Sequence, residues 1–386
     1  MSLPDPVPVV GSLSATQLRS CLNGSGLRIQ MGPFVIRVRS NIEDIAWNFE
    51  YLYTDYPLGS ADRMADFCVY AGYPRGLRRW FRPQVVFEVD GAYPYKPYPA
   101  HAAIAMLEWG LNWTLFSSAN QYLLFHAACL EKRGNCILLA GEPGSGKSTL
   151  CAAMTLKSDP WRLFTDEITI ARPNTAEILP LCRPICLKNV SIDIIENRYP
   201  DAIIGHRCAN TAKGTVAHVR VPRDAVVRMN ESARPRMILF PKYQKGAKTT
   251  WCELPKPEIL LQLAQQSFNY STLGETAFQT LKKIGIRSNA YEVVYSDLDE
   301  MLTQLDELFN DLVDNVTEPD ADTNPDTGTD PDTGIDPETG IDPETDTIPE
   351  PDTLPESANN PDSPNYFNSA ESASDATTGS SAEIVL

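Results

Sequence analysis

One stretch of eight residues constrains the fold of this chain more than any other: Gly141-Glu-Pro-Gly-Ser-Gly-Lys-Ser148. Its glycines let the backbone curve closely around a ligand, so that several N–H groups point inward. The apolar run Cys136–Ala140 precedes it, and the helix-forming run Lys147–Leu156 follows. The start of a helix attracts anions, because unpaired N–H groups and the helix dipole point there. The pattern G-x-x-x-x-G-K-[ST] in this context predicts a loop that binds nucleotide phosphates.

The loop residues have separate predicted roles. Lys147 supplies a mobile positive charge for the β- and γ-phosphates of ATP, and the Ser148 hydroxyl is a ligand for Mg²⁺. ATP and Mg²⁺ are therefore the expected cofactors. The predicted nucleotide-binding residues are Gly141, Glu142, Pro143, Gly144, Ser145, Gly146, Lys147, Ser148 and Thr149.

An acidic pair, Asp166-Glu167, follows the predicted strand Trp161–Thr165. Parallel strands in α/β folds present their carboxyl ends to the edge that holds the phosphate loop. This places both carboxylates near the γ-phosphate, where one acid holds Mg²⁺ and the other accepts the proton of an attacking hydroxyl. The alternative interpretation is a solvated acidic turn.

Strands alternate with helices from Tyr122 to Asn315, which indicates an α/β fold. Residues 1–118 are expected to form an α+β region, residues 119–315 the catalytic domain, and residues 316–386 a tail. The predicted strands and helices of the catalytic domain, beyond those named above, are Tyr122–Glu131, Val216–Val221, Met237–Phe240, Ala290–Tyr295, Pro257–Ser267, Gly274–Lys283 and Leu298–Leu312. The predicted elements of the N-terminal region are Leu27–Met31, Phe34–Arg39, Glu43–Tyr53, Asp66–Tyr70, Gln84–Val89 and Ala100–Phe116.

Two segments of the N-terminal region bear on function. The apolar run Ala102–Phe116 is interrupted by Glu108 and Asn112 and is too short to span a bilayer. The aromatic segment Gly91–Pro99 is interpreted either as a packed extended loop or as a lip over a substrate site. The N-terminus has no basic region followed by an apolar run, so no signal peptide is expected.

The charge of the chain is concentrated in its tail. From Thr317 onward there are 18 Asp and Glu and no Lys or Arg, whereas the preceding residues carry 32 acidic and 33 basic side chains. A near-neutral body gives no reason to expect nucleic-acid binding, which usually needs a basic face. The tail repeats the pattern Pro-Asp/Glu-Thr and is predicted to be disordered, because it cannot bury enough apolar surface to order itself.

The nine cysteines are odd in number and irregularly spaced, and no pair has zinc-finger spacing. Reduced thiols are the simplest interpretation and fit a cytoplasmic protein. His126 lies in an apolar strand, where a lone histidine is commonly a structural core residue. Its functional interpretation depends on a family resemblance.

The segments that carry this resemblance are Phe125–Leu130, Gly134, Ile137–Thr149, Phe164–Glu167, Arg183–Lys188 and Thr211–His218. They resemble the catalytic domain of the HPr kinase/phosphorylase family, and in particular the bacterial HprK-related kinase A group. The resemblance covers residues 122–309. It implies a P-loop kinase that phosphorylates a hydroxyl, with Asp166 as general base, His126 orienting or tuning Asp166, and Glu167 helping to hold Mg²⁺. The loop motif adds Lys147 as the third predicted catalytic residue and Ser148 as the second predicted Mg²⁺ ligand.

The sequence departs from the family pattern at three points. Ala127 replaces the glycine after the histidine, and Glu167 replaces an aspartate. No counterpart of the family's Glu-x-Arg-Gly-x-Gly-Ile signature, which serves the phosphorolytic reaction, follows the acidic pair. The resemblance therefore implies a kinase without efficient phosphorylase activity, and it leaves the classical protein substrate of the family open.

Several functions stay open on the sequence alone. The chain is interpreted as an ATP-dependent serine kinase for a protein or peptide, as a small-molecule hydroxyl kinase, or as a non-catalytic nucleotide-binding regulatory module; a scaffold role would rest on the tail alone. Arg183, Lys188 and Lys213 are candidates for phosphate or substrate contacts, with solvated or capping side chains as the default. No membrane partner is expected, and a homo-oligomer would fit the family.

Overall fold

The computed structural model describes residues 7–315 apart from 61–62, 75 and 77–79. The predicted disordered tail, residues 316–386, lies outside the described residues. The described residues form one unit with mixed α/β architecture and several sheets, in agreement with the predicted fold class. The predicted boundary at residue 118 stays a prediction.

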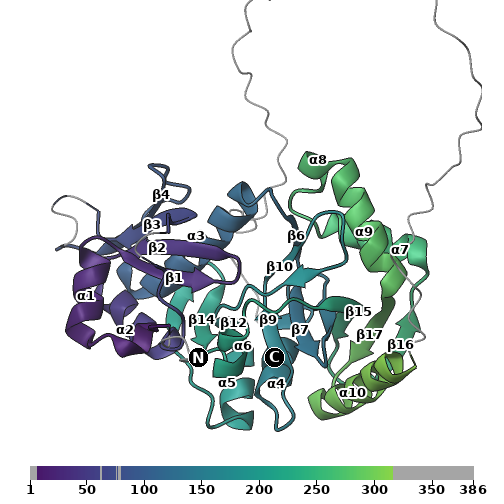
Figure 1. Cartoon of the computed structure of the whole chain (residues 1–386). Helices are drawn as coiled ribbons and strands as arrows, with labels where there is room; N and C mark the ends of the chain where they lie inside the picture. Colours follow the sequence, from purple (N-terminus) through teal and green to yellow (C-terminus); the bar gives the residue numbers. More distant parts are fainter. Residues whose placement is uncertain (1–6, 61–62, 75, 77–79, 316–386) are drawn as a thin grey trace, which may run out of the picture. The chain divides into compact units, whose positions relative to one another are not determined.

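The N-terminal region contains a five-stranded sheet of order β1-β2-β3-β4-β5, drawn in purple and blue in Figure 1. Neighbouring strands are antiparallel except β2 and β3, which are parallel. Alternating apolar and polar residues predict β1, β2 and β4 with their observed bounds, because one face of the sheet is buried. The strands are Leu27–Met31, Phe34–Arg39, Phe67–Gly72, Gln84–Val89 and Tyr98–Pro99.

Three helices accompany this sheet, together with short 3₁₀ turns at Val10–Ser12 and Ala100–Ala102. Helix α1 begins at a capping box in which the side chains of Ser14 and Gln17 satisfy each other's backbone N–H groups. Helix α3 is apolar on nearly all sides, which is typical of a buried helix. The helices are α1 (Ala15–Asn23), α2 (Glu43–Leu52) and α3 (Ala103–Ser118).

The phosphate loop belongs to a six-stranded sheet of order β16-β17-β15-β8-β7-β9. The core residues of this sheet divide between two layers: α4 and α10 cover one face, and α7 and α9 cover the other. The strands are β7 (Ala128–Lys132), β8 (Asn135–Leu139), β9 (Arg162–Thr165), β15 (Arg234–Tyr243), β16 (Thr250–Glu253) and β17 (Asn289–Tyr295). The helices are α4 (Lys147–Leu156), α7 (Lys256–Gln265), α9 (Glu275–Arg287) and α10 (Leu298–Asp314).

Two small antiparallel sheets of order β11-β10-β6 and β12-β14-β13 complete the described architecture. Their strands are β6 (Leu123–His126), β10 (Ile168–Ala171), β11 (Ile178–Leu179), β12 (Ile185–Lys188), β13 (Cys208–Thr211) and β14 (Gly214–Val219). The remaining helices are α5 (Val190–Arg198), α6 (Arg223–Val227) and α8 (Tyr270–Leu273).

The strand predicted over Tyr122–Glu131 is wrong as a single element. The chain leaves one sheet and enters another at Ala127, so that β6 pairs with β10 while β7 pairs with β8 and β9. Both halves are equally apolar, and sequence pattern alone therefore gives no sign of the change. The Thr169 hydroxyl donates to the Ala127 carbonyl oxygen at 2.9 Å and stabilises the crossover.

Two further sequence expectations concern the whole described chain. All nine cysteines are free thiols, and six of them are buried. Among residues 7–315, with the gaps given above, no helix combines the length and apolar character that a membrane crossing requires.

Candidate active site

The phosphate loop joins the end of β8 to the start of α4, as the sequence predicts. Gly141, Gly144 and Gly146 have φ angles of +124°, +85° and +96°. Residues with a Cβ atom rarely adopt positive φ angles, whereas glycine does so readily. At position 146 space is also limited, because a Cβ atom there would lie 2.5 Å from the Tyr295 hydroxyl oxygen. The glycines therefore meet a steric requirement of the loop.

The loop has features that fit a polyphosphate ligand. The Ser145 Oγ atom is buried and has no hydrogen-bond partner in the described structure. Lys147 Nζ donates to the carbonyl oxygens of Gly141 and, at 2.9 Å, of Glu142. The first N–H groups of α4 have no partner within the helix and face the loop. An oxyanion would satisfy these donors, and the residues present therefore fit ATP.

Burial and the positive charge of Lys188 together lower the pKa of Lys147 to about 8, while Glu142 and Glu167 oppose the shift. Keeping the Lys147 ammonium group charged in this position therefore costs solvation free energy. Negative phosphate oxygens would offset that cost, because an opposite charge nearby favours the charged form of an amine.

The acidic pair lies at the same edge of the sheet as the phosphate loop. Strands β8 and β9 both run antiparallel to β7, which lies between them, so β8 and β9 point in the same direction. Their carboxyl ends therefore lie at the same edge, although the sheet is mixed and the two strands are not direct neighbours. Asp166 and Glu167 are both half-buried.

The two carboxylates have different surroundings. Asp166 Oδ2 accepts a hydrogen bond of 2.8 Å from the backbone N–H of Cys186. Burial and the negative charge of Glu167 raise the pKa of Asp166 to about 7. Burial also acts to raise the pKa of Glu167, but the charges of Lys213 and Lys188 outweigh it and the pKa is lowered. The pair therefore combines one carboxylate poised to take a proton near neutral pH with one that stays ionised.

Two lysines from the small β12-β14-β13 sheet act on Glu167. Lys188 ends β12, and Lys213 lies in the turn between β13 and β14 with its Nζ atom 5.5 Å from the centre of the Trp109 ring. Burial acts to lower the pKa of Lys188, but Cys186, Glu167 and Asp166 outweigh it and the pKa is raised. Both candidate phosphate contacts therefore belong to the same electrostatic cluster as the acidic pair.

His126 ends β6, and its ring lies 6.0 Å from the ring of Phe268, centre to centre. Burial lowers its pKa, while the charge of Glu167 opposes the shift. The structure thus brings His126 into the cluster through Glu167. Tuning of Asp166 by His126 stays a prediction.

Arg183 has a different environment from the solvated or capping one taken as its default. The side chain is buried, and its Nη2 atom donates to Glu108 Oε2 at 2.6 Å. Its Nη1 atom donates to Asn112 Oδ1 at 2.5 Å. Both Nη atoms of the guanidinium are thus bound to groups of the protein, while Nε has no hydrogen-bond partner in the described structure. A solvated Arg183 is wrong, because α3 packs over it and supplies an acid at the right place.

Glu108 and Asn112 are residues that the sequence interpretation passed over as breaks in an apolar run. They lie four positions apart and therefore on one face of α3. Asn112 Nδ2 donates to Glu167 Oε2 at 2.6 Å. Two polar residues at helical spacing in an otherwise apolar helix were the available signal, because buried polar groups need partners.

The metal ligands predicted from the sequence are Ser148 and Glu167. A hydroxyl and a carboxylate suit Mg²⁺, which takes oxygen ligands and commonly completes its shell with water and substrate phosphates. In the described part of the chain, no group of three or more His, Cys, Asp or Glu forms an all-protein metal site. The donor set fits a metal that is held jointly with a nucleotide.

The aromatic segment before α3 packs against the same region. Tyr95 donates from its hydroxyl to the Trp109 carbonyl oxygen at 3.1 Å, and the Tyr98 hydroxyl accepts from the Ala212 N–H at 2.6 Å. Burial raises the pKa of Tyr95 and Glu167 raises it further. The segment is therefore a packed loop beside the acidic pair, and its role as a lip stays a prediction.

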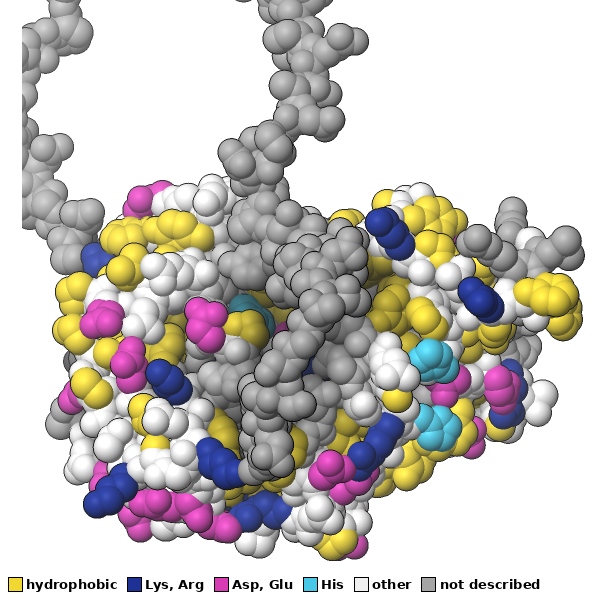
Figure 2. All heavy atoms as spheres, turned by 180° about the vertical axis from the view of Figure 1, so that it is seen from behind, with side chains coloured by type: hydrophobic (Ala, Val, Ile, Leu, Met, Phe, Trp, Pro, Cys, Tyr) yellow, Lys and Arg dark blue, Asp and Glu magenta, His cyan; other side chains and the backbone are white. Residues whose placement is uncertain are grey.

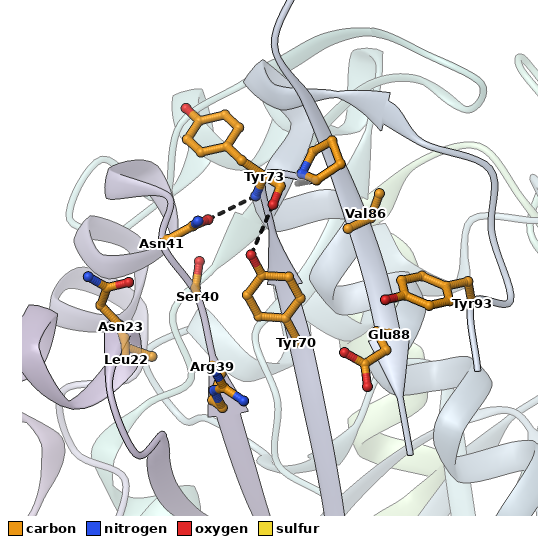
Figure 3. A pocket seen from close by; sticks show the side chains of 11 residues that line it. Leu22, Asn23, Arg39, Ser40, Asn41, Tyr70, Tyr73, Val86, Glu88 and Tyr93 are labelled. Carbon is orange, nitrogen blue, oxygen red and sulfur yellow. Dashed lines mark hydrogen bonds between the residues drawn. The ribbon is translucent and has the colours of Figure 1, made fainter. Parts of the chain in front are cut away.

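A separate hollow of about 600 Å³ lies on the N-terminal sheet (Figure 3). Arg39, Tyr70, Glu88 and Tyr93 line it, and the Tyr70 hydroxyl donates to the Tyr73 carbonyl oxygen at 3.0 Å. Its lining includes Tyr93 of the aromatic segment Gly91–Pro99, but none of the predicted catalytic, nucleotide-binding or metal-binding residues. On the face that Figure 2 shows, acidic and basic side chains of the described residues are intermixed. This distribution agrees with the near-neutral charge of the body.

The chain was compared with protein families, curated proteins and solved structures, and only solved structures gave a match. No family model matches the chain, and no curated protein matches it. Among solved structures, the chain is similar to the HPr(Ser) kinase/phosphatase from Coxiella burnetii, with 14% sequence identity and a TM-score of 0.24. The similarity covers 49% of this chain and 98% of that chain. A likeness at this level carries no argument about the site.

Proposed function

We propose that this protein is an ATP-dependent kinase that transfers the γ-phosphate to a serine or other hydroxyl of a protein or peptide. The observation that carries the proposal is the placement of Asp166, whose pKa is raised to about 7, at the sheet edge that holds the phosphate loop. A general base works best when its pKa lies near the working pH. A protein that only bound nucleotide would have no need of such a group.

The residues of the site divide the work of phosphoryl transfer. Asp166, held by the Cys186 N–H, would take the proton of the acceptor hydroxyl. Lys147, Lys188 and Lys213 would offset negative charge, which is most of what such a transfer asks of a protein. Ser148 and Glu167 would hold Mg²⁺. When bound, ATP supplies the phosphoryl group and Mg²⁺ neutralises the charge on its oxygens.

The first test compares phosphate transfer by the wild type, Asp166→Asn and Lys147→Ala on candidate hydroxyl substrates. We expect Asp166→Asn to bind ATP normally and to lose about 10²- to 10⁴-fold in turnover, the usual contribution of a general base. Lys147→Ala should bind ATP weakly, because it removes the mobile charge of the loop. Asp159→Asn is the matched control, since Asp159 is an exposed acid before the same strand.

The two alternative functions predict different outcomes of the phosphate-transfer assay. If the wild type binds ATP and transfers phosphate to nothing in a whole lysate, and Asp166→Asn matches it, the protein is a nucleotide-binding regulatory module. If transfer occurs to metabolites and to no peptide, the acceptor is a small molecule. Incubation of the phosphorylated product with inorganic phosphate tests the proposed lack of efficient phosphorylase activity.

A further inference from the structure

A bridge of hydrogen bonds joins helix α3 of the N-terminal region to the acidic pair. The amide of Asn112 donates from Nδ2 to Glu167 Oε2 at 2.6 Å and accepts at Oδ1 from Arg183 Nη1 at 2.5 Å. The orientation of this amide is determined, because an ionised carboxylate only accepts and a guanidinium only donates. Asn112 therefore has one fixed arrangement between two charged side chains.

The hydrogen bonds continue from Arg183 into the protein interior, to Glu108 and then to Tyr53. Arg183 Nη2 donates to the carboxylate of Glu108 at 2.6 Å and to its backbone carbonyl oxygen at 3.0 Å. The Tyr53 hydroxyl donates to the other oxygen of Glu108. Tyr53, Glu108 and Arg183 are all buried. Arg183 Nε has no hydrogen-bond partner in the described structure, but the other hydrogen bonds of this buried network restrict side-chain motion.

We infer that Asn112 is a positioning residue for Glu167, and that α3 is thereby part of the active site. The inference rests on the proposed function, in which Glu167 holds Mg²⁺. The bond from Asn112 occupies one oxygen of Glu167 and fixes the side chain, which leaves the other oxygen for the metal. Groups that hold a metal ligand in this way are known to set its affinity.

The positive charges around Glu167 explain why positioning is needed. Lys188 and Lys213 both attract its carboxylate. A mobile glutamate would turn toward either ammonium group, and the metal would then have to compete for it. Asn112 holds the carboxylate with a neutral group and so keeps Glu167 in one position between these charges.

The test measures how Mg²⁺ strengthens nucleotide binding, followed by fluorescence of an ATP analogue in the full-length protein. We expect Asn112→Leu and Asn112→Ala to raise the Mg²⁺ concentration for half-maximal effect by about 10- to 100-fold, as is usual for lost partners of metal ligands. Binding of the same analogue in EDTA should be unchanged. Ser118→Ala is the control, since Ser118 is an exposed residue of the same helix.

Two variants with different side-chain volumes separate positioning from packing. If Asn112→Leu loses its cooperative urea unfolding curve, Asn112→Ala still reports on the missing hydrogen bond. A merely structural role would weaken binding in EDTA and in Mg²⁺ by the same factor, and this result would overturn the inference.

Glu167→Gln distinguishes failure of this inference from failure of the proposed function. If Glu167→Gln loses the Mg²⁺ effect while both Asn112 variants behave as the wild type, α3 has no positioning role and the kinase proposal stands. If the wild type itself shows no Mg²⁺ effect, the metal role of Glu167 is wrong, and the inference falls with it.

Discussion

The molecule contains two buried glutamate–arginine pairs with the same chemistry and different surroundings. In one, Arg162 Nε donates to Glu131 Oε2 at 2.5 Å, and the side chains are 5% and 4% exposed. In the other, Arg183 Nη2 donates to Glu108 Oε2 at 2.6 Å, and the side chains are 9% and 4% exposed. Burial and distance thus make the two pairs nearly equal.

The remaining donors and acceptors of each pair decide what it does. Arg162 Nη1 donates to the backbone carbonyl oxygen of Arg228 at 2.8 Å, and Glu131 Oε1 accepts from the Gly134 N–H at 2.6 Å. This pair thus binds main-chain groups of two turns, with the side chains of Arg228 and Glu231 as more distant ion-pair partners at 3.9 and 4.0 Å. The Glu108–Arg183 pair ends on Asn112 and, through it, on Glu167. The same chemical pair therefore serves folding in one place and, on our proposal, the site in the other.

The largest effect should come from removing one partner of either pair. We expect Arg162→Met and Arg183→Met each to lower the free energy of unfolding by about 3–5 kcal/mol, because each removes the nearest counter-charge of a buried carboxylate. Urea unfolding followed by circular dichroism measures this.

The functional contrast between the two pairs is tested on the same variants below their unfolding temperatures. Arg183→Met should weaken the Mg²⁺ effect on nucleotide binding, and Arg162→Met should leave it intact. Equal loss in both variants would show that the pairs do not differ in role.

A smaller effect on the free energy of unfolding should appear with pH, and it concerns a histidine near the Glu108–Arg183 pair. His218 is buried near Glu108, Arg183, Glu167 and Lys188, and burial lowers its pKa from 6.5. The unfolded chain binds a proton there below about pH 6.5 that the folded chain does not, so the free energy of unfolding falls as pH drops below that value.

This pH dependence is checked by urea unfolding between pH 7.5 and 5.5. His218→Leu should flatten the curve, because both ring nitrogens lack a hydrogen-bond partner in the described structure and the swap breaks no bond. His101→Gln, at an exposed histidine, is the control. An unchanged slope in His218→Leu would assign the pH effect to other groups.

The smallest effect should come from an arginine–glutamate pair at the surface. Arg172 Nε and Glu177 Oε2 lie 2.5 Å apart, with side chains 49% and 33% exposed. Solvent screens such pairs, and Arg172→Ala should change the free energy of unfolding by less than about 1 kcal/mol. A loss as large as that of Arg162→Met would mean that burial does not govern these pairs.

Local elements could be predicted from the sequence where a pattern has one structural solution. Helix α4 has the predicted bounds Lys147–Leu156, because the glycines before it and the helix formers within it agree. Helix α1 was missed, since its nine residues are mostly polar and its start depends on the Ser14–Gln17 capping box. Strands β10 to β13 were missed as well, because they are short and are stabilised by pairing with distant strands.

The structure shows where each predicted site residue lies. The loop glycines, Lys147, Asp166 and Glu167 lie at one edge of the six-stranded sheet, whereas His126 ends a strand of another sheet. Their roles in binding and catalysis stay predictions.

By itself the sequence determined the phosphate loop, since glycine conformation and the positions of Lys147 and Ser148 follow from residues adjacent in the chain. It also determined the near-neutral body and the acidic tail. Only the tertiary structure decided which buried charges meet, because Glu108 and Arg183 are 75 residues apart. The physical reason is that a local motif carries its own geometry, whereas a buried charge takes whichever partner the packing of distant elements places beside it.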